Sequence, residues 1–218
     1  MIHNVKVKTS YHVVVVDVGS PKLGNIGWCV FDILNGCKYK GDNLEDLIGK
    51  LSGLLATAGV LFGLEAPLCV PIRENIMDAT RARKGEGRRP WSAGAGAQVL
   101  TMNLPIMVFL LKKLKVIKNT LSLFYNEDGF VGSPGELMFF EALVSGVDKG
   151  KTHIDDAEIM VDTCIQSSLQ KQLPQSILEM ENTTEYFNLV VAAAMRAGFE
   201  NNQRMLWQYT PIYKPMRS

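Results

Sequence analysis

The chain has 218 residues, of which 47% are hydrophobic and 21% are charged, and its formal net charge is +1. This length and apolar content suffice for one sizeable core, so we expect a single domain over residues 1–218. The balanced charge excludes a protein that attracts polyanions over its whole surface, so any nucleic-acid contact must be a local patch.

Cysteine usage and hydropathy indicate a cytoplasmic protein. The chain has four cysteines, none in a C-x-x-C pair, which is too few for a disulfide framework at this length. The N-terminus lacks an apolar run of signal-peptide length, and the apolar run 189–195 is too short to span a bilayer. We therefore expect a reduced, cytoplasmic location and no membrane partner.

Three strand patterns follow one another near the N-terminus. A β-branched run within residues 11–18 predicts a buried strand, and residues 26–34 predict a second strand close enough to form a hairpin with it. Asn35-Gly36 is a strong signal for a two-residue turn, after which residues 37–40 fit a short third strand.

A helix and a fourth strand come next. Apolar residues fall on one helical face from Leu44 to Leu55, with Asn43 as the N-cap and Gly59 as the stop. Residues 60–64 then predict a strand. A helix of this length between two strands indicates a crossover that returns the fourth strand to the same sheet.

Regular patterns stop at residue 69 and resume near residue 98. Residues 69–97 are rich in glycine and arginine, and we expect them to form a long inserted loop. A glycine-spaced basic run suits nucleic-acid phosphates, which we assign to Arg81, Arg83, Lys84, Arg88 and Arg89. We expect Trp91 to stack on a base. A solvated loop anchored by Trp91 is the alternative.

The remaining patterns complete an α/β fold. They predict a helix over 98–115 interrupted at Pro105, strands over 121–125 and 136–140, helices over 153–169 and 184–197, and an edge strand within 206–215. We expect a mixed five-stranded sheet, three antiparallel strands and then parallel strands, flanked by helices. The core spans about 11–170 and a C-terminal extension about 171–218. The last helix has an apolar face that fits either this core or a second copy of the chain, as in a homodimer.

Acidic residues stand at the ends of predicted strands. Asp17 ends the first strand and Glu65 the fourth, and ligand sites gather beyond the carboxyl ends of strands in such sheets. His153 and Asp156 share one face at the start of a helix. Clustered carboxylates need a neutralising partner, and oxygen and nitrogen ligands of this kind suit Mg²⁺ or Mn²⁺.

Two further acidic residues are weaker site candidates. Asp155 follows Thr152 in a spacing typical of a capping box, so we expect Asp155 to be structural and Asp156 to be the ligand. Glu141 directly follows the strand predicted over 136–140.

Three stretches resemble the motifs of RuvC-type domains in the RNase H-like superfamily. The first is Val14-Val15-Val16-Asp17-Val18-Gly19-Ser20 followed by Asn25-Ile26-Gly27-Trp28-Cys29-Val30. The second and third are Gly63-Leu64-Glu65 and His153-Ile154-Asp155-Asp156-Ala157. Glu65-Ala66-Pro67, the arginine-rich stretch and Glu141 also make the chain similar to an uncharacterised family of small RNase H-like proteins, which are predicted nucleases.

The resemblance extends over about residues 11–165 and implies an RNase H-like fold. It implies that Asp17, Glu65 and Asp156 are metal ligands, and that His153 is a further ligand or positions the attacking water. The activity it implies is that of a nuclease that hydrolyses phosphodiester bonds in DNA or RNA with two Mg²⁺ or Mn²⁺ ions.

Two other functions remain open. The turn Asp17-Val18-Gly19-Ser20 also resembles the phosphate-binding turn of the related actin-hexokinase branch, which would indicate ATP binding or phosphoryl transfer. A nucleic-acid-binding module that has lost turnover would keep the same fold.

Overall fold

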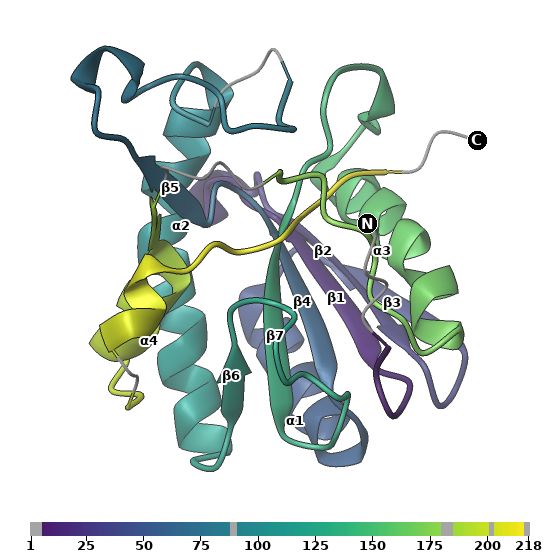
Figure 1. The fold of residues 1–218 in the computed structure, drawn as a ribbon. Helices are drawn as coiled ribbons and strands as arrows, with labels where there is room; N and C mark the ends of the chain where they lie inside the picture. Colours follow the sequence, from purple (N-terminus) through teal and green to yellow (C-terminus); the bar gives the residue numbers. More distant parts are fainter. Residues whose placement is uncertain (1–5, 88–90, 180–184, 201–202, 216–218) are drawn as a thin grey trace.

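A mixed sheet with helices on both faces forms the centre of the molecule (Figure 1), a computed structural model that describes residues 6–87, 91–179, 185–200 and 203–215. Within these residues the sheet has seven strands in the order β3-β2-β1-β4-β7-β6, with β9 also paired to β7. The strands are β1 His12–Asp17, β2 Gly27–Asp32, β3 Cys37–Gly41, β4 Val60–Glu65, β6 Ser122–Phe124, β7 Glu136–Ala142 and β9 Ile212–Tyr213.

Strand directions divide the sheet into two parts. β2 is antiparallel to both β1 and β3, whereas β4 is parallel to β1 and β7 is parallel to β4. β6 and β9 also run parallel to β7. The expected mixed sheet of antiparallel and then parallel strands is confirmed, but it has seven strands among the described residues rather than the expected five. β9 is the edge strand expected within 206–215.

β1 is buried on both faces, which explains its continuous apolar sequence. Val14 and Val16 pack in the core beneath three helices, and Val13 and Val15 pack beneath a fourth. The three helices on the first face are α1 Leu44–Thr57, α2 Ala95–Ile117 and α4 Leu189–Arg196, and the helix on the second face is α3 His153–Leu169. The result is a sandwich of helix, sheet and helix layers.

The start of α1 follows its sequence signal, whereas the bounds of α2 differ from expectation. The side chain of Asn43 accepts hydrogen bonds from the backbone N–H groups of Glu45 and Asp46, which makes it the N-cap of α1, as predicted. α2 is longer than expected and continues through Pro105. Its apolar stripe, which includes the buried Leu110 and Leu111, holds the helix on the core despite the missing proline N–H.

The described residues of the stretch 69–97 form more regular structure than expected. Cys69–Ile72 form β5, which pairs antiparallel with β8, Glu185–Asn188, in a separate two-stranded sheet. The prediction of a helix from residue 184 was therefore wrong for its first turn, because these residues pair with β5. Asn188 then caps α4 by accepting from the N–H groups of Val190 and Val191. Short 3₁₀ helices are η1 Pro21–Leu23, η2 Ile76–Asp78, η3 Gly146–Asp148 and η4 Gln203–Trp207.

The C-terminal extension is part of the domain rather than an appendage. β9 joins the central sheet, and α4 packs on α2 with Leu189, Val190 and Val191 in the main core. The apolar face of this helix thus contacts its own chain. The Asn35-Gly36 turn also differs from expectation, because Asp32 pairs with Cys37 and the loop has four residues. Among the described residues no helix is both long and apolar enough to cross a membrane.

Candidate functional site

The register of the central strands places Asp17 and Glu65 side by side. The two residues are direct partners at the carboxyl ends of the parallel strands β1 and β4. Side chains alternate along a strand, so Asp17 shares the face of Val13 and Val15, and Glu65 shares that of Leu61, which lie in the core beneath α3. Both carboxylates therefore point to the α3 side of the sheet.

The first turn of α3 brings His153 and Asp156 to these carboxylates. Its apolar stripe, Ala157, Met160, Val161 and Cys164, packs on β1 and β2 and fixes the helix on the sheet. Gly27 lies directly beneath the first turn, since a Cβ there would be 2.3 Å from the backbone nitrogen of Ile154. The close approach needs a residue without a side chain at this position.

Three of the four predicted residues form a compact carboxylate cluster. Ligand oxygens of Asp17, Glu65 and Asp156 all lie within 4.8 Å of one another. Asp17 and Asp156 are buried, and the side chain of Glu65 is 13% exposed. His153 is half-exposed, and its Nδ1 lies 2.5 Å from Oδ2 of Asp17. The structure thus places all four residues together, and the three carboxylates could hold a metal ion.

Lys149 also belongs to this cluster, and sequence reasoning missed it. Its ammonium nitrogen lies 2.8 Å from Oδ2 of Asp156 and 3.1 Å from Oε1 of Glu65. The other oxygen of Asp156, Oδ1, accepts a 2.6 Å hydrogen bond from the backbone N–H of Gly150. Lys149 lies in a loop, where no periodic pattern indicates which way a side chain points. Its position four residues before His153 was the only sequence feature that could have indicated its place in the site.

Burial dominates the electrostatics of the cluster. It raises the pKa of Asp17 above its ordinary value, against the opposing effect of His153. Burial and the nearby Asp17 together raise the pKa of Glu65 to about 9. Burial alone would lower the pKa of Lys149, but the hydrogen bond to Asp156 and the charge of Glu65 raise it. Ionised carboxylates here need more positive charge than Lys149 supplies.

One buried oxygen of the cluster lacks a hydrogen-bond partner within the described part of the chain. Oε2 of Glu65 is buried and accepts no hydrogen bond from any described residue. A buried acceptor without a donor is costly, and a cation with a preference for oxygen ligands would satisfy it.

A cavity of about 570 Å³ opens beside the carboxylates. Asp17, Glu65, Lys149 and His153 line one side of it, and Trp91 lies in its wall together with the start of α2. Its lining residues come from the ends of β1, β4 and β7, from the segment between β5 and α2, and from the loop before α3. Its volume suits a ligand the size of a nucleotide.

Glu141 does not join the cluster. It shares the face of Leu137 and Phe139, opposite to that of Asp17, because β7 alternates in the same way. Its carboxylate accepts hydrogen bonds of 2.8 and 2.6 Å from the two terminal nitrogens of Arg83 and one of 3.0 Å from the N–H of Leu68. Glu141 is therefore part of a buried ion-pair network.

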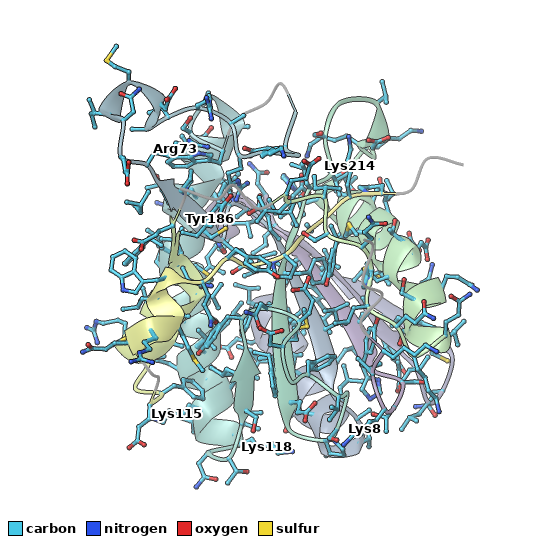
Figure 2. All side chains as sticks on the ribbon, viewed as in Figure 1. Lys8, Arg73, Lys115, Lys118, Tyr186 and Lys214 are labelled. Carbon is cyan, nitrogen blue, oxygen red and sulfur yellow. The ribbon has the colours of Figure 1, made fainter. Side chains whose placement is uncertain are left out.

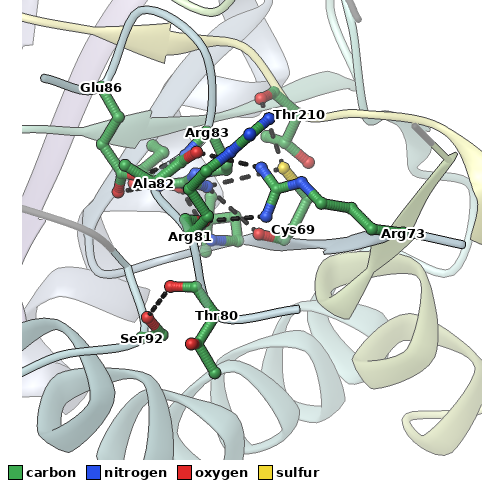
Figure 3. A network of polar contacts seen from close by, with 11 residues as sticks. Cys69, Arg73, Thr80, Arg81, Ala82, Arg83, Glu86, Ser92 and Thr210 are labelled. Atoms are coloured by element: carbon green, nitrogen blue, oxygen red, sulfur yellow. Dashed lines mark hydrogen bonds and ion pairs between the residues drawn. The ribbon is translucent and has the colours of Figure 1, made fainter. Parts of the chain in front are cut away.

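Arg83 is the centre of that network rather than an exposed phosphate ligand, which corrects the prediction for this residue. Its side chain is fully buried and also binds Glu86 at 2.9 Å and the carbonyl oxygen of Cys69 at 3.1 Å. Figure 3 shows Arg83 between Glu86 and Cys69, with Arg73 beside them. Arg73 donates to the carbonyl oxygens of Asp78, Arg81 and Ala82 and so shapes the loop.

The other basic-loop candidates lie in different settings. Arg81 is exposed and lies 3.6 Å from Asp78, and Lys84 is exposed and lies 2.9 Å from Glu179. Arg88 and Arg89 fall outside the described residues. Trp91 is half-buried, and its indole N–H, which is buried, has no hydrogen-bond partner among the described residues.

A second basic run consists of Lys112, Lys113, Lys115 and Lys118 and lies outside the lining of the cavity. Figure 2 shows Lys115 and Lys118 at the lower end of the molecule, whereas Arg73 lies at the upper end. Lys118 donates to the carbonyl oxygen of Leu55 at 2.8 Å, and Lys113 pairs with Glu45 at 3.1 Å. This run contributes nothing to the cavity.

Asp155 has the structural role that the sequence predicted. It forms a capping box with Thr152 at the start of α3, and its Oδ2 also accepts from the N–H of Lys151.

Comparison of the chain with protein-family models, curated proteins and solved structures found no match.

Proposed function

We propose that the protein is a divalent-metal-dependent nuclease that hydrolyses phosphodiester bonds in DNA or RNA. The observation that carries this proposal is the convergence of Asp17, Glu65 and Asp156 within 4.8 Å at the carboxyl ends of β1 and β4. The order β3-β2-β1-β4-β7, antiparallel and then parallel, is the arrangement that an RNase H-like fold requires and so supports the assignment of this fold.

The donor set fits Mg²⁺ or Mn²⁺. Both ions prefer carboxylate oxygens, and Oε2 of Glu65 is a buried acceptor that no described residue contacts with a hydrogen bond. Asp17, Glu65 and Asp156 are the residues that would hold the ion. Bound there, a divalent ion would stabilise the negative charge that develops on the phosphate and increase the acidity of a bound water.

His153 has the position of a proton acceptor. When Asp17 is ionised, Nδ1 of His153 donates to it, which leaves Nε2 free to accept a proton from the attacking water. The contact also fixes the orientation of the ring at the edge of the cavity. The half-buried Trp91, which also lines the cavity, offers an apolar surface for the base of a substrate nucleotide.

The phosphate-turn alternative has less support. A Cβ at Gly19 would lie 1.5 Å from the carbonyl oxygen of Asn25, so this glycine is needed for packing within its own turn. Thermal stabilisation by ATP with Mg²⁺, and not by oligonucleotides, would favour that alternative over the nuclease.

The test is cleavage of labelled single-stranded, duplex and branched oligonucleotides in Mn²⁺. We expect Asp156→Asn to lower the rate at least about 100-fold, because it removes a ligand of the charge-stabilising ion. The neighbouring Asp155→Asn is the matched control, since it loses only a capping interaction worth about 1 kcal/mol of stability. Cleavage that persists in Asp17→Ala would assign the activity to a contaminant, and binding without cleavage would favour a binding module.

A further inference from the structure

The ammonium group of Lys149 lies within the carboxylate cluster. Its nitrogen lies 3.1 Å from Glu65 and 2.8 Å from Asp156, within ion-pair distance of both carboxyl groups. Asp17 has a different partner, since Oδ2 lies 2.5 Å from Nδ1 of His153. Two of the three carboxylates therefore already share one positive charge that belongs to the chain.

The local backbone holds Lys149 in this position. The N–H of the next residue, Gly150, donates to the other oxygen of Asp156, so residue 149 is fixed relative to the carboxylate it contacts. A Cβ at Gly150 would lie 2.4 Å from Cβ of Asp155, so the loop approaches α3 more closely than any other residue would allow. The lysine side chain is 45% exposed and lines the cavity, where a substrate phosphate can reach it.

Charge balance then limits how many metal ions the cluster accommodates. The three ionised carboxylates carry three negative charges, and Lys149 reduces this excess to two. One divalent ion completes the neutralisation, whereas two ions would leave an excess of two positive charges with Lys149 and of only one without it, in a site whose carboxylates are largely buried.

We propose that Lys149 takes the place of one of the two cations expected from sequence, so that the site binds a single divalent ion. This inference rests on the proposed function. Lys149 is then a catalytic residue that contacts the phosphate of the substrate. Oε2 of Glu65, the buried oxygen described above, is then a ligand of the metal ion.

The decisive measurement is the number of Mn²⁺ ions bound per chain, obtained by titration with detection of free Mn²⁺ by electron paramagnetic resonance. We expect one ion for the wild-type chain and for Lys149→Arg, which keeps the charge. We expect two ions for Lys149→Met, because loss of the ammonium group frees the second position. Lys149→Gln serves as a second neutral variant should the methionine variant fail to fold.

Lys151→Met is the matched control. Residue 151 is an exposed lysine of the same loop, and this variant should bind one ion as the wild type does. Two ions in the wild-type chain, or one ion in both neutral variants of residue 149, would overturn the role of Lys149 and leave the nuclease proposal standing. No Mn²⁺ binding to any of these chains would overturn the metal site itself.

Discussion

The carboxyl group of Glu65 lies in surroundings that favour its neutral form. Its pKa is about 9 in the folded chain and near 4.5 in an unfolded one, mainly because of burial. Between these pH values the folded state holds more protons than the unfolded state, so the metal-free protein must lose stability as the pH rises. The loss amounts to several kcal/mol, since one pKa unit corresponds to about 1.4 kcal/mol.

Thermal unfolding in EDTA at pH 5 and pH 8.5 tests this expectation. The wild-type chain should melt at a lower temperature at pH 8.5, and Glu65→Gln should remove most of the difference because it cannot ionise. Glu74, an exposed carboxylate, provides the control variant Glu74→Gln, which should behave as the wild type does. An equal pH effect in wild type and Glu65→Gln would show that another group is responsible.

The sequence predicted most residues of the carboxylate cluster, but it did not show which other residues lie beside them. Asp17 and Glu65 follow apolar strand runs, so their arrival at one sheet edge was predictable. Glu141 also ends a strand, and only the register of β7 shows that it faces the other side. Lys149 was missed because its loop conformation depends on the contact of Gly150 with α3, which no local pattern encodes.

Arg83 ties the segment between β5 and α2 to the end of β7. Its guanidinium pairs with Glu86 and Glu141, and all three side chains are almost completely buried. Removal of one partner leaves the others charged and without compensation, which typically costs about 3–5 kcal/mol. Arg83→Met should therefore lower the free energy of unfolding by this amount in urea denaturation.

The neighbouring Arg81 is the matched control for Arg83. It is exposed, and Arg81→Met should cost less than about 1 kcal/mol. If Arg83 instead served as a phosphate ligand, its replacement would weaken oligonucleotide binding and leave the urea midpoint unchanged.

Helices and strands were predictable where the sequence carries a clear hydrophobic pattern. α1 and β1 have such patterns, and both agree with expectation. β5 and β8 do not, since β5 has only four residues and contains Pro71, so tertiary pairing decides its conformation. The same pairing converts the expected first turn of the last helix into β8.

Among the described residues that line the cavity, Lys149 is the only lysine or arginine. The net charge is +1, Arg83 is buried, and Lys84 pairs with Glu179. Lys115 and Lys118 lie at the end of the molecule opposite to Arg73 (Figure 2). We expect affinity for nucleic acid to depend on a small number of phosphate contacts.

This expectation is measurable as the salt dependence of oligonucleotide binding to the metal-loaded protein. The slope of log K against log salt concentration should correspond to no more than about three phosphate contacts. Trp91→Ala should weaken binding of a single strand by roughly 1–3 kcal/mol without a change in that slope, because stacking involves no ion release. A slope typical of six or more contacts would mean that an extended basic surface binds the nucleic acid.

Gly27 connects the shape of the sheet to the spacing of the site. A methyl group there would separate α3 from β2, and His153 and Asp156 would move away from Asp17 and Glu65 as one unit. A displacement of about 1 Å is enough to lower a catalytic rate about 100-fold. Gly27→Ala should therefore remain folded by circular dichroism yet lose affinity for Mn²⁺. Replacing Gly27 by residues of increasing size would therefore increase the distance between the strand carboxylates and the first turn of α3. Residue 27 acts as a spacer, and none of the metal ligands is changed.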